Sequence, residues 1–547
     1  MKKLRNVVLA GILIVVSLAV AGFVQRPDIY FLIKKNFTIF SEVYREVSLH
    51  YVDQVDPEKL MRKGIGAMLE SLDPYTILID EADSQNMEII TRGSYGGVGL
   101  DVGYREGKIV VIAPIEGYAA HRKGIRTGDV IIAVDGVSVD SMSPEEVQNL
   151  TTGEPGTFVT LEIHRYGIDH PLSFKLERQR ITVKNIAYAG LIGKEHDIGY
   201  ILLSRFSQNT AEEIRNAIEQ FQSKTKLRGL ILDLRNNPGG LLDEAVGTVD
   251  KFVPPGIKVV ETRGRLNQHN DVFRTGESAI APDLPLIVLQ NGGSASASEI
   301  VAGALQDLDR AVIMGQQSFG KGLVQIVRPL SYNTALKITT ARYYIPSGRS
   351  IQSVTYTHDE GNSVVKKPDS LRRAFKTRNG RTVYDGNGIT PDVEISIPRP
   401  TLLQSSLQHQ NQFFDFANHY AATHDSLAEL FSSDKLYQSF MTFLEQEGFH
   451  YQTSSEIYLA KIDSSMGGKI VETHIDAIRQ HIDSLKKKAF YEQREEIEKE
   501  LYLELLTRYK GKQEQIAASL PYDHFVNQAI DLFHNPNRYK NILSSSN

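Results

Sequence analysis

Residues 291–325 constrain this chain more than any other stretch, and they read NGGSASASEIVAGALQDLDRAVIMGQQSFGKGLVQ. They place Ser296 at the predicted start of a helix and Lys321 in a glycine-flanked turn. A serine hydroxyl is a weak nucleophile until a base takes its proton, and lysine can be that base only when it is neutral. The segment therefore predicts a Ser-Lys nucleophile pair, in a hydrolase that works through an acyl-enzyme.

The surroundings of Lys321 suit a neutral amine. A lysine base needs a pKa several units below its reference value of about 10.4, which burial without a counter-charge can produce. Residues 318–324 contain no acid and carry apolar side chains around the turn. Taken alone, however, Lys321 also fits a solvated turn lysine.

Ser296 also has a structural interpretation. Ser296 and Glu299 match a capping box, with serine at the N-cap and glutamate at N3, before an apolar run at 300–302. The two interpretations are compatible, because a nucleophile at a helix start also gains from the positive end of the helix dipole. Spacing alone leaves Ser294 and Ser298 open as alternative nucleophiles.

The turn around Lys321 partly imitates a nucleotide-binding loop. Residues 315–321 match the first seven positions of a P-loop, but the eighth must be serine or threonine and is Gly322. A P-loop also runs into a helix, whereas residues 323–329 alternate like a strand and end in proline. The sequence therefore disfavours nucleotide binding.

A second motif lies upstream of the serine. Residues 230–234 (LILDL) predict a buried strand, which breaks into RNNPGG at 235–240 before a helix that begins near Leu241. Backbone N–H groups in such a turn can hold a developing oxyanion, and glycine allows the close approach of a carbonyl. The alternative is a tight turn that uses glycine only for its backbone angles.

Three motifs in this order carry a resemblance. DLRNNPGG at 233–240, GSASASEIVAGAL at 293–305 and FGKGLVQ at 319–325 resemble the signature of the carboxy-terminal processing peptidases, also called tail-specific proteases. The resemblance implies a serine endopeptidase with a Ser-Lys dyad and an inserted PDZ domain.

The resemblance also implies roles for single residues. The nucleophile, the base and an amide that orients the base would be Ser296, Lys321 and Gln325. The oxyanion would be held by the backbone N–H groups of Ala297 and of a glycine in the Asn-Pro-Gly-Gly turn, Gly239 in preference to Gly240.

The segment before the protease motifs resembles a PDZ domain. Residues 96–102 (GGVGLDV) look like the PDZ loop that receives a peptide's terminal carboxylate on backbone amides, followed by the strand to which the peptide adds. Residues 119–136 and a predicted helix over 144–150 continue the pattern. The implied peptide-binding residues are Gly97, Val98, Gly99 and Leu100. A glycine-rich bulge is the alternative for the loop taken alone.

The N-terminus predicts export. Lys2, Lys3 and Arg5 precede residues 7–24, eighteen residues without a charge. This pattern is typical of a signal peptide or a membrane anchor, and its length lies at the border between the two, so cleavage stays open. The positive flank predicts an exported chain whose catalytic part is periplasmic or otherwise extracytoplasmic, with membrane association through this segment.

The expected fold class is an α/β protease core, a mixed β-sheet with flanking helices, with an inserted PDZ domain and helical segments at both ends. The expected domains are a signal or anchor at 1–27, a helical region at 28–83, the PDZ domain at 84–178, the protease core at 179–397 and a helical domain at 398–547. The last segment is rich in Leu, Phe, Glu, Lys and Gln. The sequence does not choose between dimerisation, adaptor binding and substrate gating for the helical ends.

Composition excludes several classes. The net charge is −5 without a basic stripe, which argues against nucleic acid, and the absence of cysteine excludes disulfides, thiolate metal sites and a cysteine nucleophile. We expect no metal and no cofactor. The predicted function is an exported serine endopeptidase acting on proteins or peptides with apolar C-terminal tails.

Two other classes compete with this prediction. One is a PDZ binding or scaffolding protein with an inactive protease core, against which the Ser-Lys-Gln set argues. The other is an esterase or lipase, disfavoured because no Gly-x-Ser-x-Gly elbow surrounds Ser296.

Overall fold

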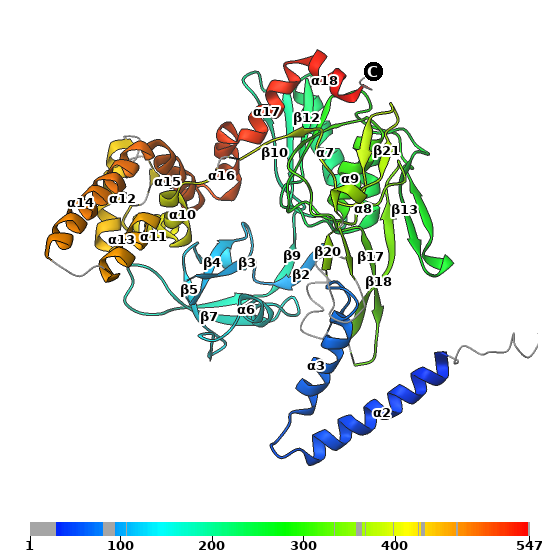
Figure 1. Ribbon diagram of the computed structural model, residues 1–547, viewed down its shortest axis with the longest axis horizontal. Helices are drawn as coiled ribbons and strands as arrows, with labels where there is room; N and C mark the ends of the chain where they lie inside the picture. Colours follow the sequence, from blue (N-terminus) through cyan, green and yellow to red (C-terminus); the bar gives the residue numbers. More distant parts are fainter. Residues whose placement is uncertain are drawn as a thin grey trace, which may run out of the picture. The chain divides into compact units, whose positions relative to one another are not determined.

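The described part of the chain forms two compact units, one ending at Leu78 and the other beginning at Ile79 (Figure 1). The computed structural model describes residues 29–79, 93–105, 107–332, 334–356, 364–366, 368–397, 399–424, 426–427, 433–465 and 469–544. The predicted export segment at 7–24 lies outside these residues. No helix within them is both long enough and apolar enough to cross a membrane.

The first unit contains two helices, α2 (Ile29–His50) and α3 (Pro57–Glu70). The side chain of Asp56 caps α3 by accepting hydrogen bonds from the first N–H groups of the helix. No side chain along α2 is buried. The region predicted as helical at 28–83 is therefore mostly helical where it is described.

A six-stranded sheet lies at the centre of the second unit, in the order β10-β11-β12-β15-β16-β23. Its strands are β10 (Ile186–Ile192), β11 (Ile198–Leu203), β12 (Gly229–Asp233), β15 (Leu286–Gln290), β16 (Val312–Gly315) and β23 (Val393–Glu394). β10 runs antiparallel to β11, and all other neighbours are parallel. Every residue of β12, β15 and β16 is buried, which is typical of parallel strands covered on both faces.

Helices cover both faces of this sheet (Figure 1). One face shares a hydrophobic core with α7 (Thr210–Lys224), α8 (Leu242–Asp250) and α9 (Ala297–Asp307). The other face packs against α17 (His524–Phe533) and α18 (Pro536–Leu543). The last two helices of the chain thus complete the core sheet, although they come from the segment predicted as a separate helical domain.

A second, antiparallel sheet positions the lysine turn. It contains β13 (Lys258–Gly264), β14 (Asp271–Arg274), β17 (Leu323–Pro329) and β18 (Ala335–Tyr344). Strand β17 begins two residues after Lys321, so the path of the turn is set by the pairing of β17 with β18.

The segment predicted as a PDZ domain has its own sheet and its own hydrophobic core. It contains β3 (Leu100–Arg105), β4 (Lys108–Pro114), α5 (Ala119–Arg122), β5 (Val130–Val134), β6 (Val137–Ser138), α6 (Pro144–Thr151), β7 (Phe158–His164) and β8 (Leu172–Glu177). Near the start of this segment, β2 (Ser94–Gly97) pairs with β9 (Gln179–Thr182), which follows the predicted end of the segment. The chain therefore enters and leaves this segment side by side, as expected for a domain inserted into another.

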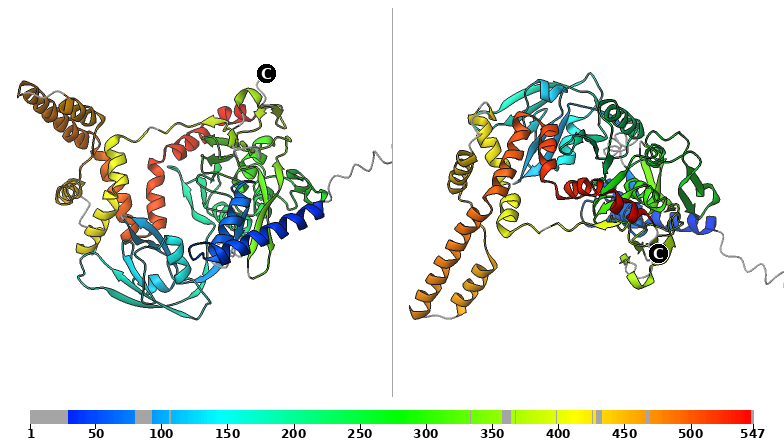
Figure 2. Two further views of the ribbon diagram at one scale, coloured as in Figure 1. Left: turned by 60° about the horizontal axis from the view of Figure 1, so that its bottom comes forward. Right: turned by 90° about the horizontal axis from the view of Figure 1, so that it is seen from above.

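Five helices, α10, α11, α12, α14 and α15, share a further aromatic and aliphatic core, while α13 packs against α14 and α16 contacts α15 and β10. Their bounds are α10 (Leu402–His409), α11 (Gln412–Thr423), α12 (Ser433–Gln446), α13 (Ser454–Ser465), α14 (Lys469–Glu492), α15 (Arg494–Tyr509) and α16 (Lys512–Ser519). Figure 2 shows α13 and α14 lying side by side. The architecture agrees with the predicted fold class.

Candidate active site

Ser296 lies at the point where the loop after β15 enters α9. Its backbone has φ 55° and ψ −113°, an unfavourable conformation for a residue with a side chain. Such strain persists only where the surrounding structure imposes it, and it clusters at functional sites. The conformation therefore marks Ser296 as a candidate functional residue independently of any sequence motif.

The two rival serines have structural partners. The hydroxyl of Ser294 donates to the carbonyl oxygen of Leu234 at 2.7 Å, and the hydroxyl of Ser298 donates to that of Asn237 at 2.9 Å. Both side chains are buried. Because each proton is already given to a backbone carbonyl, these serines tie the α9 loop to the upstream turn, and the geometry favours Ser296 as the nucleophile.

Glu299 joins the serine loop to the lysine turn. Its Oε2 accepts hydrogen bonds from the backbone N–H of Ser296 at 2.9 Å and of Lys321 at 2.8 Å. Its Oε1 accepts from the hydroxyl of Ser318 at 2.6 Å and from the N–H of Gly320 at 2.7 Å. One carboxylate therefore brings the backbones of the predicted nucleophile and the predicted base together.

The Glu299 carboxyl is fully buried. Burial raises its pKa, and the hydrogen bonds from Ser318 and from three backbone N–H groups oppose that rise. All four donors point at an acceptor, which is the arrangement that suits an ionised carboxylate. The sequence identified only the local half of this role, the hydrogen bond that Glu299 accepts from the N–H at the helix start. The bonds that it accepts from the 318–321 turn depend on the fold.

The turn that carries Lys321 is held from both sides. The N–H of Phe319 donates to the carbonyl oxygen of Ser294 at 3.0 Å, and the N–H of Gly322 donates to Oε1 of Gln352 at 2.7 Å. These bonds fix the backbone on either side of Lys321. The lysine is therefore presented by a rigid turn next to the start of α9.

Gln325 lies on β17, directly opposite Thr339 of the neighbouring strand β18. Its side-chain amide donates to the hydroxyl of Thr339 on β18 at 3.2 Å. The predicted action of Gln325 on Lys321 stays a prediction.

The Asn-Pro-Gly-Gly turn lies directly against the serine. A Cβ atom added to Gly239 would lie 2.8 Å from Cβ of Ser296 and 2.6 Å from the carbonyl oxygen of Ala295. The N–H of Ala295 also donates to the carbonyl oxygen of Asn237 at 3.0 Å. Glycine is thus required at 239 because the turn and the nucleophile loop are in contact.

Two backbone N–H groups at this contact are candidate oxyanion donors. Among the described residues, the N–H groups of Ala297 and Gly240 have no acceptor, whereas the N–H of Gly239 donates to Oδ1 of Asn237 at 2.9 Å. In this conformation the N–H of Gly240, rather than that of Gly239, is available to donate a hydrogen bond to an oxyanion. The assignment of oxyanion donors to Ala297 and Gly239 stays a prediction.

A buried ion cluster anchors the strand that leads into this turn. Arg235 binds Asp233 at 2.5 Å and Asp523 at 2.7 Å, and the hydroxyl of Tyr200 donates to Asp233 at 2.8 Å. Burial would lower the pKa of Arg235, but the two aspartates outweigh it and raise that pKa, so the guanidinium stays charged. Since Asp523 caps α17, the cluster links the active-site turn to the end of the chain.

The predicted peptide-binding loop of the PDZ segment connects β2 to β3. Gly97 ends β2, Leu100 begins β3, and both Val98 and Leu100 are buried. Gly99 has φ +77°, and a Cβ there would lie 2.5 Å from Cβ of Tyr118, so only glycine fits. Helix α6 packs against β3. The role of these four residues in peptide binding stays a prediction.

Family models match three parts of the chain. The model of peptidase family S41 matches residues 197–360, that of the PDZ domain matches 86–164, and that of the probable PDZ-protease C-terminal helical domain matches 403–533. These matches confirm the predicted fold class.

Two curated relatives are similar to more than half of the chain. The chain is 43% identical over 339 residues to a carboxy-terminal-processing protease of Bartonella bacilliformis, covering 61% of this chain and 76% of that protein. It is 37% identical over 309 residues to a carboxyl-terminal-processing protease of Synechocystis, covering 56% of this chain and 70% of that protein. A solved structure of a photosystem II D1 C-terminal processing protease is 28% identical, with a TM-score of 0.35, over 68% of this chain and 95% of that one. The chain belongs to peptidase family S41, as a serine protease of the carboxy-terminal processing type.

Proposed function

We propose that this protein is an exported serine endopeptidase in which Ser296 is the nucleophile and Lys321 is the base. The observation that carries the proposal is that a single oxygen, Oε2 of Glu299, accepts hydrogen bonds from the backbone N–H groups of both residues. Two residues anchored on one oxygen atom have neighbouring backbones, which is the first requirement for a nucleophile and its base.

The reaction follows from this arrangement. Neutral Lys321 takes the proton of Ser296 as the serine oxygen attacks a peptide carbonyl. The oxyanion is held by the N–H of Ala297 and by a glycine N–H of the 239–240 turn. Lys321 then gives the proton to the departing amine, and a water activated by the same lysine hydrolyses the acyl-enzyme. We further propose that the Gln325 amide orients the lysine.

Substrate choice is proposed to lie in the PDZ segment. The N–H groups of residues 97–100 would receive a terminal carboxylate, and the tail would add as a strand beside β3 and α6. The curated relatives are named for carboxy-terminal processing, which supports the proposal that the PDZ segment recognises C-terminal tails of substrates. Export rests on the basic start and the apolar run at 7–24.

The test uses the full chain and an unfolded reporter protein with an apolar C-terminal tail. We expect the wild type to cleave it, and both Ser296→Ala and Lys321→Ala to lose activity by about 10³-fold or more, because neither group replaces the other. A reporter whose tail ends in an amide should be cleaved far more slowly.

Each alternative predicts another result. Cleavage that survives Ser296→Ala would move the nucleophile to Ser294 or Ser298. Tail binding without cleavage by the wild type would favour a binding protein with an inactive core. Cleavage of simple esters but not of the tailed reporter would favour an esterase.

A further inference from the structure

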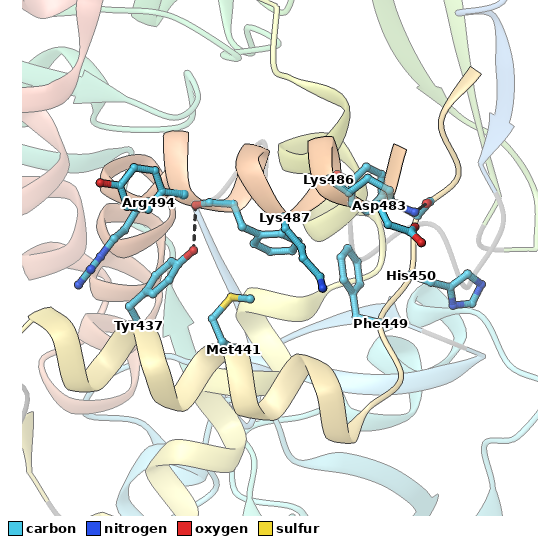
Figure 3. A pocket seen from close by; sticks show the side chains of 11 residues that line it. Tyr437, Met441, Phe449, His450, Asp483, Lys486, Lys487 and Arg494 are labelled. Carbon is cyan, nitrogen blue, oxygen red and sulfur yellow. Dashed lines mark hydrogen bonds between the residues drawn. The ribbon is translucent and has the colours of Figure 1, made fainter. Parts of the chain in front are cut away.

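A pocket with aromatic walls lies within the C-terminal group of helices, between α12, α14 and the segment 449–451 (Figure 3). Its volume is about 480 Å³, within the range of small-ligand sites. The apolar part of the wall consists of Tyr437, Met441, Phe449, Tyr451, Phe490 and Tyr491. The pocket has no part in the proposed reaction.

The walls of this pocket are held in place by bonds between helices. The hydroxyl of Tyr437 on α12 donates to the carbonyl oxygen of Phe490 on α14 at 2.8 Å, a bond drawn in Figure 3. The rings of Phe449 and Phe490 meet edge to face, with centroids 6.4 Å apart. The pocket is therefore formed before any ligand enters, which lowers the entropic cost of binding.

The cationic side chains at the rim of the pocket differ in whether they form ion pairs. Lys486 is bound to Glu456 at 3.0 Å, and Arg494 is bound to Glu498 at 2.7 Å. Lys487, in contrast, has no ion pair or hydrogen bond with any described residue, and Figure 3 shows its side chain beside Phe449. Asp483 is the only acidic side chain among the described lining residues. Among the described lysines and arginines that line the pocket, Lys487 is thus the one left without a counter-charge, and a single carboxylate is its natural partner.

The segment along one edge of the pocket has backbone N–H groups without acceptors among the described residues. It runs from Phe449 to Gln452 without regular secondary structure. Among the described residues, none accepts a hydrogen bond from the N–H groups of residues 450–452. Such N–H groups can donate to the carbonyl groups of an extended peptide.

We propose that this pocket binds an acidic peptide segment presented by another protein. A bulky apolar side chain of the segment lies among the aromatic rings, and a neighbouring carboxylate pairs with Lys487. The helical region is thereby a second recognition surface, separate from the site that reads C-terminal tails.

The test uses the full chain carrying Ser296→Ala, so that a peptide probe is not cleaved. The probe is fluorescein-labelled Glu-Glu-Leu-Phe-Glu-Glu with an amidated end, which withholds a terminal carboxylate from the PDZ segment. Binding is followed by fluorescence anisotropy. We expect saturable binding that Lys487→Glu weakens by roughly tenfold or more, because a close charge pair becomes a repulsion.

Lys488→Glu is the matched control. Lys488 neighbours Lys487 on α14, is exposed and lies outside the pocket, where it pairs with Glu492 at 3.3 Å. The same charge change there should alter the affinity less than about twofold. A probe with lysines in place of the glutamates should bind the wild type weakly and Lys487→Glu more tightly. Circular dichroism melting checks that both variants fold.

Three results would overturn the proposal. One is equal weakening by the two variants, and another is no saturation up to about 1 mM probe. The third is self-association of the wild type, measured by sedimentation velocity, that Lys487→Glu abolishes and Lys488→Glu does not, while the probe does not bind. That result would make the pocket an interface between copies of this chain.

Discussion

Glu299 and Asp233 are both fully buried carboxylates next to active-site turns, yet different kinds of donor stabilise their charges. Glu299 is surrounded by backbone N–H groups and one hydroxyl, whereas Asp233 is paired with the guanidinium of Arg235. Backbone donors fix the course of the chain, so Glu299 sets the geometry of the site. A cation neutralises charge, so Asp233 mainly secures the strand that carries the turn.

Among the variants that test this comparison, Glu299→Gln is expected to have the largest effect. Whichever way the amide lies, its NH₂ faces an N–H donor of the lysine turn, so the turn bearing Lys321 shifts from the start of α9. We expect kcat on the tailed reporter to fall about 100-fold, since small displacements of reacting groups have costs of that size. Glu495→Gln, an exposed change on α15, is the control. A wild-type kcat for Glu299→Gln would remove its role in positioning.

Asp233→Asn should affect stability more than chemistry. It breaks a buried ion pair and leaves Arg235 with Asp523 alone, which we expect to lower the free energy of unfolding by about 3–5 kcal/mol. Urea unfolding measures this change, and kcat measured well below the melting temperature should stay within a few-fold of wild type. If kcat instead fell as in Glu299→Gln with stability unchanged, the division of roles between the two carboxylates would be wrong.

Asp523→Ala tests the other end of the cluster. Its side chain accepts from the N–H groups of Phe525 and Val526 at the start of α17 and also binds Arg235. Loss of the cap should lower the free energy of unfolding by about 1–2 kcal/mol. A double mutant with Asp233→Asn should be less destabilised than the sum of the two, because both changes act on one guanidinium. Strict additivity would separate α17 from the active-site strand.

The smallest effect concerns a mostly exposed carboxylate, Glu277. Hydrogen bonding and charge attraction from Lys251 lower the pKa of Glu277 below its usual 4.5. A lowered folded pKa means that the stabilisation is complete above the unfolded pKa and is lost as the pH falls through the folded pKa. The unfolding free energy of Glu277→Gln should therefore depend less on pH below about pH 4.5 than that of the wild type. The difference should be less than about 1 kcal/mol, because solvent screens this exposed pair. An unchanged acid slope would contradict the pairing.

Several features of the site were readable from local sequence. The helix start at Ser296, the glycine-flanked lysine turn and the Asn-Pro-Gly-Gly turn all come from short motifs, and the structure has each of them. Local patterns work here because caps and turns depend on neighbouring residues and on glycine's backbone freedom. The roles of Gln325, Gly239 and the PDZ loop residues remain predictions.

Other features were not readable in this way. The bonds of Glu299 to the lysine turn, and those of Ser294 and Ser298 to the upstream turn, join segments that are far apart in the chain. Nothing in the polar helical tail indicated that α17 would cover one face of the core sheet. Such contacts arise from sheet order and packing, which no short window of sequence encodes.

Short stretches of the amino-acid sequence specify the chemical groups and their local backbone: a serine at a helix start, a lysine between glycines, and turns that require glycine. Which of these groups meet depends on the packing of distant segments: the Glu299 carboxylate joins the serine loop to the lysine turn, and Arg235 joins Asp233 to Asp523 at the start of α17. The physical reason is that local conformation follows from neighbouring residues, whereas burial and hydrogen-bond partners follow from the complete packing of the chain.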